Sequence, residues 1–360
     1  MQPSNVIVLT NGMLNSPFAK TCHGLLRGSD RFRTIAVIDD QFAGQDAGEV
    51  MDGKYLDIPI FERVEAFFRA GLEKPKYLVV GVALPGGILP DTFQAAILTA
   101  IQNGLSIVCG LHKFLSEDPV FAEAAKKAGV SLIDVRKARP RQELQFWTGE
   151  IYTVKAPIIA VLGIDCAVGK RTTCRFLMEM CRENGIPTEM IYTGQTGWMQ
   201  GYPHGFIFDS TVNDFIGGEM ERAIVNCYKA SKPELILLEG QSALRNPTGP
   251  CGAEFLLSGN AKAVVLQYTP GRAHYEDTKV PLPSLESEIA LIGAYGAKVL
   301  AITLNDEALS ESEWRQHQRD IQEKTGLPCI HPLVEGVEGL LPLIRTYIAT
   351  FDEPHSPCPS

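Results

Sequence analysis

The chain has 360 residues and a net charge of −9, with 45% hydrophobic and 21% charged residues. This length predicts about two domains, and the composition is that of a soluble globular protein. The acidic balance excludes a polyanion-binding face, so no nucleic-acid partner is expected, and no apolar run approaches the roughly 20 residues that cross a bilayer, so no membrane partner is expected.

Residues 1–145 alternate between strand-like apolar runs and helical stretches. In the interval Asp91–Gly104, Phe93, Ile97 and Ile101 share one helical face. This alternation predicts an α/β domain with a parallel sheet wrapped by helices. The expected strands are Val6–Thr10, Thr34–Ile38, Tyr77–Val82, Leu105–Cys109 and Ser131–Val135.

The turn after the first of these strands resembles a dinucleotide-binding layout only loosely. Thr10-Asn11-Gly12 follows the first strand and Asp39-Asp40 follows the second, but the three-glycine fingerprint is absent. The missing fingerprint weakens the case for a nicotinamide cofactor in this half.

The same pattern restarts in residues 146–350, which predicts a second α/β domain. Its expected strands are Pro157–Leu162, Glu189–Thr193, Leu235–Leu238, Ala263–Gln267 and Lys298–Leu304. Its expected helices include Val212–Lys229, Leu285–Tyr295 and Glu311–Lys324. The tail 351–360, rich in Pro, Ser and charge, is predicted to be disordered.

The strongest motif, Gly163–Thr173, joins the first strand of this second domain to a helix. A glycine-rich turn with a lysine at the helix start directs backbone N–H groups and the positive end of the helix dipole at an anion. We predict a phosphate-bearing ligand here; the alternative is a tight turn alone. The candidate ligand-binding residues are Gly163, Asp165, Val168, Gly169, Lys170, Arg171, Thr172 and Thr173.

This loop departs from the usual phosphate-loop pattern. Five residues separate its glycines instead of four, as in dethiobiotin synthetases, whose loop it resembles, and Arg171 occupies the position of the usual hydroxyl residue. One helical residue is about 100° of rotation, so Thr172 does not simply inherit the magnesium-binding place. Phosphate binding is therefore favoured over phosphoryl transfer.

Other candidates follow the ends of later strands, where ligands bind in open α/β sheets. Glu239 ends an apolar strand and is a candidate base or metal ligand, with Gln241 beside it; a strand-end acid that caps the next turn is the alternative. His274, in a long loop, is a second candidate base.

Three further residues are candidates for substrate binding. Gln195 and Thr196 lie in a glycine-containing segment after a strand end, where they offer hydrogen bonds, although a plain turn explains the segment nearly as well. Arg245, just past Glu239, is placed to grip a carboxylate.

These motifs together resemble domain-of-unknown-function family 1611. The resemblance rests on Gly163–Thr173, Thr193–Gly197, Glu239–Gln241, Lys20–Gly24 and Gly110–His112, and it extends from about residue 5 to 345. It implies a Rossmann-like domain followed by a P-loop domain. It also implies an activity assigned to some members, N-acetylation of D-glutamate by acetyl-coenzyme A, with Glu239 or His274 as base and Gln241 near the oxyanion.

Two alternatives stay open. One is an ATP- and Mg²⁺-dependent ligase or kinase like dethiobiotin synthetase, in which Glu239 with Thr172 or Asp165 would hold the metal. The other is a nucleotide-binding regulator without turnover. In each enzymatic case the partner is a small amino acid or carboxylate.

The nine cysteines contain no CxxC pair, and the amino end lacks the cationic start of a signal peptide. Reduced thiols in a cytoplasmic protein are therefore expected. We also expect the chain to form a homo-oligomer.

Overall fold

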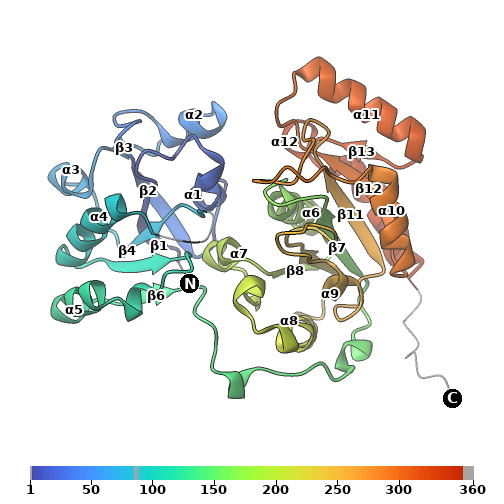
Figure 1. The fold of residues 1–360 in the computed structure, drawn as a ribbon, viewed down its shortest axis with the longest axis horizontal. Coiled ribbons are helices and arrows are strands. Elements are labelled where there is room, and N and C mark those ends of the chain that lie inside the picture. Colours follow the sequence, from blue (N-terminus) through green and yellow to red (C-terminus); the bar gives the residue numbers. More distant parts are fainter. Residues whose placement is uncertain (1, 85–86, 88, 352–360) are drawn as a thin grey trace. The chain divides into compact units, whose positions relative to one another are not determined.

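The structure is a computed structural model that describes residues 2–84, 87 and 89–351. The chain divides into two compact units, Met1–Ala138 with Gln195–Pro203 and Arg139–Gly194 with His204–Ser360 (Figure 1). The units therefore divide earlier than the predicted boundary at residue 145. Of the tail predicted to be disordered, only Phe351 lies within the described residues, and its ring packs 6.1 Å from that of Tyr347.

The first unit contains a sheet of parallel strands in the order β3-β2-β1-β4-β5-β6. Its strands are β1 (Ser4–Leu9), β2 (Phe32–Ile38), β3 (Ile60–Phe61), β4 (Tyr77–Val80), β5 (Ser106–Cys109) and β6 (Leu132–Asp134). The five predicted runs coincide with five of these strands. The two-residue edge strand β3 was not predicted because it is too short to show a period.

Helices cover both faces of this sheet, and the alternation of side chains along β1 shows how. Ile7 and Leu9 belong to the core cluster that includes residues of α3, α4 and α5, whereas Val6 and Val8 belong to the cluster with α1, α2 and α7. The helices are α1 (Lys20–Leu26), α2 (Ala47–Asp52), α3 (Val64–Arg69), α4 (Asp91–Gln102), α5 (Pro119–Ala128) and α7 (Gln195–Gln200).

The second unit contains a parallel sheet in the order β13-β12-β11-β7-β10-β8-β9. Its central strands are continuous apolar runs, as expected for a sheet buried on both faces. The strands are β7 (Ile158–Gly163), β8 (Thr188–Tyr192), β9 (His204–Gly205), β10 (Leu235–Glu239), β11 (Ala263–Tyr268), β12 (Lys298–Leu304) and β13 (Cys329–Ile330).

The helices of the second unit pack on both faces of its sheet. Helix α6 contacts β7, β8 and β10, and α8, α9 and α10 contribute Met220, Phe255 and Ile292 to the cluster around Ala160 and Leu238. The helices are α6 (Lys170–Glu183), α8 (Ile216–Ser231), α9 (Ala253–Leu256), α10 (Leu285–Ala294), α11 (Glu311–Thr325), α12 (Pro332–Glu335) and α13 (Leu341–Ala349). No helix in the described ranges is both long and apolar enough to cross a membrane.

The segment after β8, for which a plain turn was the alternative interpretation, forms helix α7, which packs against α1 in the first unit. Thr196 and Thr21 share a hydrogen bond of 3.2 Å between their hydroxyls, and the Gln200 side-chain amide donates to the Gly24 carbonyl at 2.9 Å. A helix forms here because these tertiary contacts override the low helix propensity of a glycine-containing segment.

Candidate functional site

The glycine-rich loop lies at the carboxyl end of β7, in the middle of the second sheet. β7 pairs with β10 on one side and β11 on the other. Helix α6 begins directly after the loop, at Lys170. Since β10 ends at Glu239, the structure brings the loop and this carboxylate to the same edge of the sheet, as the sequence predicted.

The loop backbone is shaped to receive an anion. Ala167 has a φ of 53° and Gly169 a φ of 107°, both in the left-handed region. Within the described residues, the backbone N–H groups of Ala167, Val168 and Gly169 donate no hydrogen bond. Gly163 is required because a Cβ there would lie 2.8 Å from the Val168 side chain. A run of unpaired N–H groups before a helix start is a recognised anion-binding arrangement.

Lys170 is folded back onto the loop. Its Nζ donates to the backbone carbonyls of Asp165 at 2.6 Å and Ser242 at 2.9 Å, and the residue is only 7% exposed. The ammonium group is therefore held against the loop by two neutral carbonyls. A bound anion would meet a positive charge that is already positioned.

Asp165 holds neighbouring segments together. Its buried carboxylate accepts hydrogen bonds from the Cys166 N–H at 2.7 Å, Asn246 Nδ2 at 3.0 Å, Arg272 Nη1 at 2.8 Å and the Glu276 N–H at 2.7 Å. A carboxylate has about four acceptor positions, and these contacts use them. In this structure Asp165 fastens the loop to the segments that follow β10 and β11, and its predicted part in binding the ligand or a metal stays a prediction.

The hydroxyl groups on the first turn of α6 have different environments. Thr172 is partly exposed. Thr173 is buried, and its Oγ1 donates to Gln267 Oε1 at 2.7 Å, so this hydroxyl is already engaged. Among the described residues, no group of three or more His, Cys, Asp or Glu side chains is arranged to hold a metal ion.

Glu239 is buried and bound to the end of β8. Its Oε2 accepts from the Thr193 N–H at 2.9 Å, and the Gly194 N–H also donates to the carboxylate. Burial raises the pKa of Glu239, against the opposing charges of Arg171 and Lys170 and the two N–H donors. A buried carboxylate with a raised pKa, beside two cations, suits a general base.

Gln241 extends the same network. Its Nε2 donates to Thr193 Oγ1 at 3.1 Å, and this hydroxyl in turn donates to the Glu239 carbonyl at 2.5 Å. One N–H of the Gln241 amide is thus used inside the protein and the second remains available for a ligand. The network fixes the side chains of Glu239 and Gln241 relative to each other.

The remaining predicted residues are not joined to this network. The Arg245 guanidinium pairs with the buried Glu288 at 2.7 Å and also donates to Ser287. His274 is exposed, and no side-chain contact within the described residues connects it to Glu239. Gln195 and Thr196 lie in α7, within the first unit. Their roles stay predictions.

Sequence reasoning missed three residues that shape the loop. Arg272 binds Asp165 and the Cys166 carbonyl, Asn246 binds Asp165, and Gln267 binds Thr173. The sequence could have indicated Gln267, because it is a polar residue near the end of an otherwise apolar buried strand.

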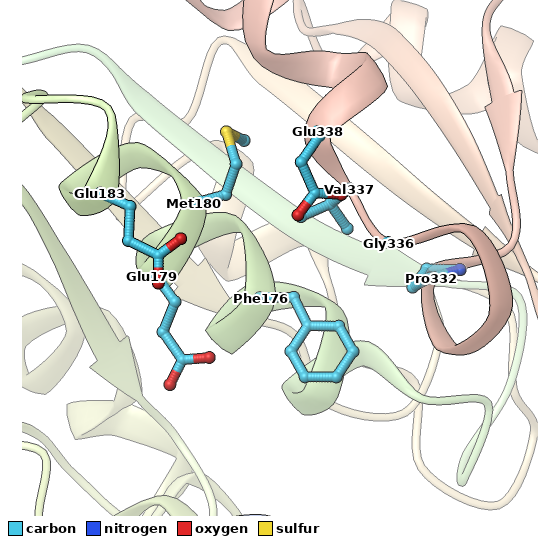
Figure 2. A pocket seen from close by; sticks show the side chains of 8 residues that line it. All are labelled: Phe176, Glu179, Met180, Glu183, Pro332, Gly336, Val337 and Glu338. Carbon is cyan, nitrogen blue, oxygen red and sulfur yellow. The ribbon is translucent and has the colours of Figure 1, made fainter.

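A separate hollow of about 250 Å³ lies along the far part of α6 (Figure 2). Figure 2 shows Phe176, Glu179, Met180 and Glu183 on α6, across from Pro332, Gly336, Val337 and Glu338. Because no residue of the Gly163–Thr173 loop lines this hollow, it is not an extension of the candidate site.

In the first unit, a carboxylate fills the place that resembled a dinucleotide site. Buried Asp39 accepts from the Thr10 hydroxyl at 2.7 Å and from the N–H groups of Gly12, Leu14 and Gln41 at 2.9, 3.0 and 3.1 Å. These are the donors that a phosphate would need at this turn. In this structure the Asp39 carboxylate, and not a ligand, accepts from these donors.

Two named proteins and one solved structure are similar to this chain over most of its length. Two proteins named D-glutamate N-acetyltransferase, from Pseudoalteromonas sp and Tritonibacter scottomollicae, are each 28% identical to it over 274 and 278 residues, or 74% of this chain and 80% of theirs. A crystal structure of a DUF1611 family protein from Anabaena variabilis is 29% identical, with a TM-score of 0.85 over 95% of this chain and 99% of that chain.

Family models match both halves. The one described as "Domain of unknown function (DUF1611_N) Rossmann-like domain" matches residues 40–138, and the one described as "Domain of unknown function (DUF1611_C) P-loop domain" matches residues 145–341, more than half of the chain. The predicted family and fold class are confirmed: the protein belongs to the DUF1611 family, with a Rossmann-like domain followed by a P-loop domain.

Proposed function

We propose that the protein is an N-acyltransferase that anchors acetyl-coenzyme A by its phosphates in the Gly163–Thr173 loop and acetylates a small amino acid such as D-glutamate. The observation that carries the proposal is the set of unpaired N–H groups at Ala167, Val168 and Gly169 beside the Lys170 ammonium. The names of the two relatives support the choice of reaction.

The loop's chemistry favours a ligand held by hydrogen-bond donors. Asp165 has no acceptor position left for a metal, and Arg171 stands where magnesium-dependent loops carry a hydroxyl. Coenzyme A carries a pyrophosphate and a ribose phosphate, which backbone N–H groups, a lysine and an arginine bind without phosphoryl transfer.

The reaction requires a base. The amine nitrogen of the acceptor attacks the thioester carbonyl carbon, the C–S bond breaks, and the amine proton passes through the base to the departing thiolate. Glu239 suits this role because its pKa is raised by burial. The second N–H of the Gln241 amide is suited to stabilise the oxyanion, and His274 is the alternative base.

Calorimetry tests the anchor. Wild-type protein is expected to bind coenzyme A in the presence of EDTA, and Lys170→Ala to weaken this binding by about 10- to 100-fold, because a charge-assisted hydrogen bond contributes about 1.5–3 kcal/mol. Lys324→Ala, an exposed lysine on α11, is the matched control and should bind normally.

The reaction itself is tested by incubating the protein with acetyl-coenzyme A and D- or L-glutamate and measuring free thiol and N-acetylated product. Product formation is the expected result. Binding of ATP only with Mg²⁺, followed by ADP release, would replace the proposal with the ligase or kinase. Binding of a nucleotide with no product would favour the regulator.

A further inference from the structure

Gln267 is a buried polar residue that the proposed mechanism does not use. It lies near the end of β11, paired in register with Gly163, the first glycine of the loop, and its residue exposure is 2%. Its backbone carbonyl accepts from the Ile164 N–H at 3.2 Å, which fastens the strand to the start of the loop. The side chain therefore stands at the base of the anion-binding turn.

The orientation of the Gln267 amide is set by two threonines. Its Oε1 accepts from Thr173 Oγ1 on α6 and from Thr303 Oγ1 on β12, each at 2.7 Å. With the oxygen held by both hydroxyls, Nε2 faces the other way. It lies 3.6 Å from the position that a Cβ of Gly169 would occupy, so it borders the loop glycine that precedes Lys170.

The Nε2 group has no acceptor of its own. Within the described residues it donates no hydrogen bond, and it is not among the fully buried side-chain atoms that lack a partner, so it keeps access to the space beside the loop. The neighbouring N–H groups of Val168 and Gly169 are also donors without a partner there. Several unpaired donors gathered at one place require an acceptor with several oxygens, such as a phosphate.

We propose that Gln267 is a ligand-binding residue of this site: its Nε2 donates to an anionic oxygen of the phosphate or pyrophosphate held by the loop. This proposal rests on the proposed function only in requiring a phosphate-bearing ligand there. Gln267 supplies a neutral hydrogen-bond donor, and Thr173 and Thr303 fix its orientation. The proposal expects this donor to act on a phosphate or pyrophosphate group bound without Mg²⁺.

The test uses coenzyme A and inorganic pyrophosphate as probes in calorimetry with EDTA. Gln267→Met, similar in size but without an N–H donor, is expected to bind both probes at least 10-fold more weakly than wild type. Gln316→Met, the same substitution at an exposed residue on α11, is the control and should stay within about threefold of wild type.

A second variant gives a readout that loss of packing alone would not. Gln267→Glu keeps the acceptor for both threonines and places a carboxylate beside the anion, so its binding deficit should grow as pH rises and shrink when Mg²⁺ is added. The affinity of wild type for both probes should not change when Mg²⁺ is added. Circular dichroism melting shows whether each variant is folded. If Gln267→Met is unfolded, the pH and Mg²⁺ dependence of binding by Gln267→Glu tests the role of Gln267.

The outcomes separate this proposal from the proposed function. If wild type binds coenzyme A, Lys170→Ala loses that binding, and folded Gln267 variants bind like wild type, the role of Gln267 is overturned and the anchor stands. If wild type binds neither probe, both proposals fall. If wild type binds both probes, the folded Gln267 variants bind them more weakly, and no acetylated product forms, the role of Gln267 is retained and the acyltransferase is rejected.

Discussion

Replacing Asp165 by Ala is expected to lower the melting temperature of the P-loop unit by about 10 °C. The substitution leaves the Arg272 guanidinium, whose side chain is 12% exposed, without its buried partner, and it leaves the N–H groups of Cys166 and Glu276 without an acceptor. Removing one partner of a buried ion pair costs about 3–5 kcal/mol, and each kcal/mol shifts the midpoint by about 2–4 °C in a unit of this size.

Differential scanning calorimetry measures this effect. Asp214→Ala, at an exposed aspartate of the same unit, is the matched control and should melt within about 1 °C of wild type. The double variant Asp165→Ala/Arg272→Ala should be less destabilised than the sum of the single variants, because it removes both charges together. A single Asp165→Ala variant that melts like wild type would show that Asp165 does not fasten the loop.

Replacing Glu239 by Gln is expected to reduce kcat for acetyl transfer by at least about 100-fold, the ordinary contribution of a general base. Stability should not fall, because the Gln side-chain oxygen can still accept from the Thr193 and Gly194 N–H groups and no charge is buried. The pKa of Glu239 is raised in the folded state, so the stability it contributes is present at acid pH and lost as pH rises through that pKa. At neutral pH the variant should therefore melt at or above the wild-type temperature.

The pH dependence gives a second readout of the same variant. Because a base acts when it is deprotonated, wild-type kcat/KM should fall as pH is lowered through a pKa above the ordinary value of 4.5 for glutamate. In the Glu239→Gln variant, kcat/KM should no longer show this fall at low pH, which is the acid limb of the profile. Glu234→Gln, at an exposed glutamate just before the start of β10, should keep both the rate and the limb. A near-normal rate in Glu239→Gln would instead assign Glu239 a purely structural role.

The sequence predicts the two sheets well because their strands are buried on both faces. β12 has the predicted bounds, Lys298–Leu304, and the predicted α10 and α11 each differ by one residue at one end. Strands β9 and β13, with two residues each, carry no pattern that could be recognised. Helix α7 was not predicted, because its formation depends on contacts with α1, which no local pattern contains.

The candidate site shows a similar limit. The loop and Glu239 are local signals, each at the end of an apolar strand, and the structure places them together. The partner of Asp165 is Arg272, which lies 107 residues further along the chain, and composition and spacing do not connect two such positions. For the same reason the sequence could not show that Arg245 pairs with Glu288, or that Asp165 has no free acceptor position.

Ligand protection of Cys166 tests the central claim most directly, because this residue is part of the loop and is the one cysteine among the described residues that is not buried. Alkylation by iodoacetamide can be followed by mass spectrometry of the Cys166 peptide, with the Cys358 peptide, outside the described residues, measured separately. Saturating acetyl-coenzyme A, which has no free thiol to consume iodoacetamide, is expected to slow alkylation of Cys166 at least tenfold in wild type and to have little effect in Lys170→Ala at the same concentration. An unchanged rate at a concentration where calorimetry shows full binding would contradict the account, since the ligand would then lie away from the loop.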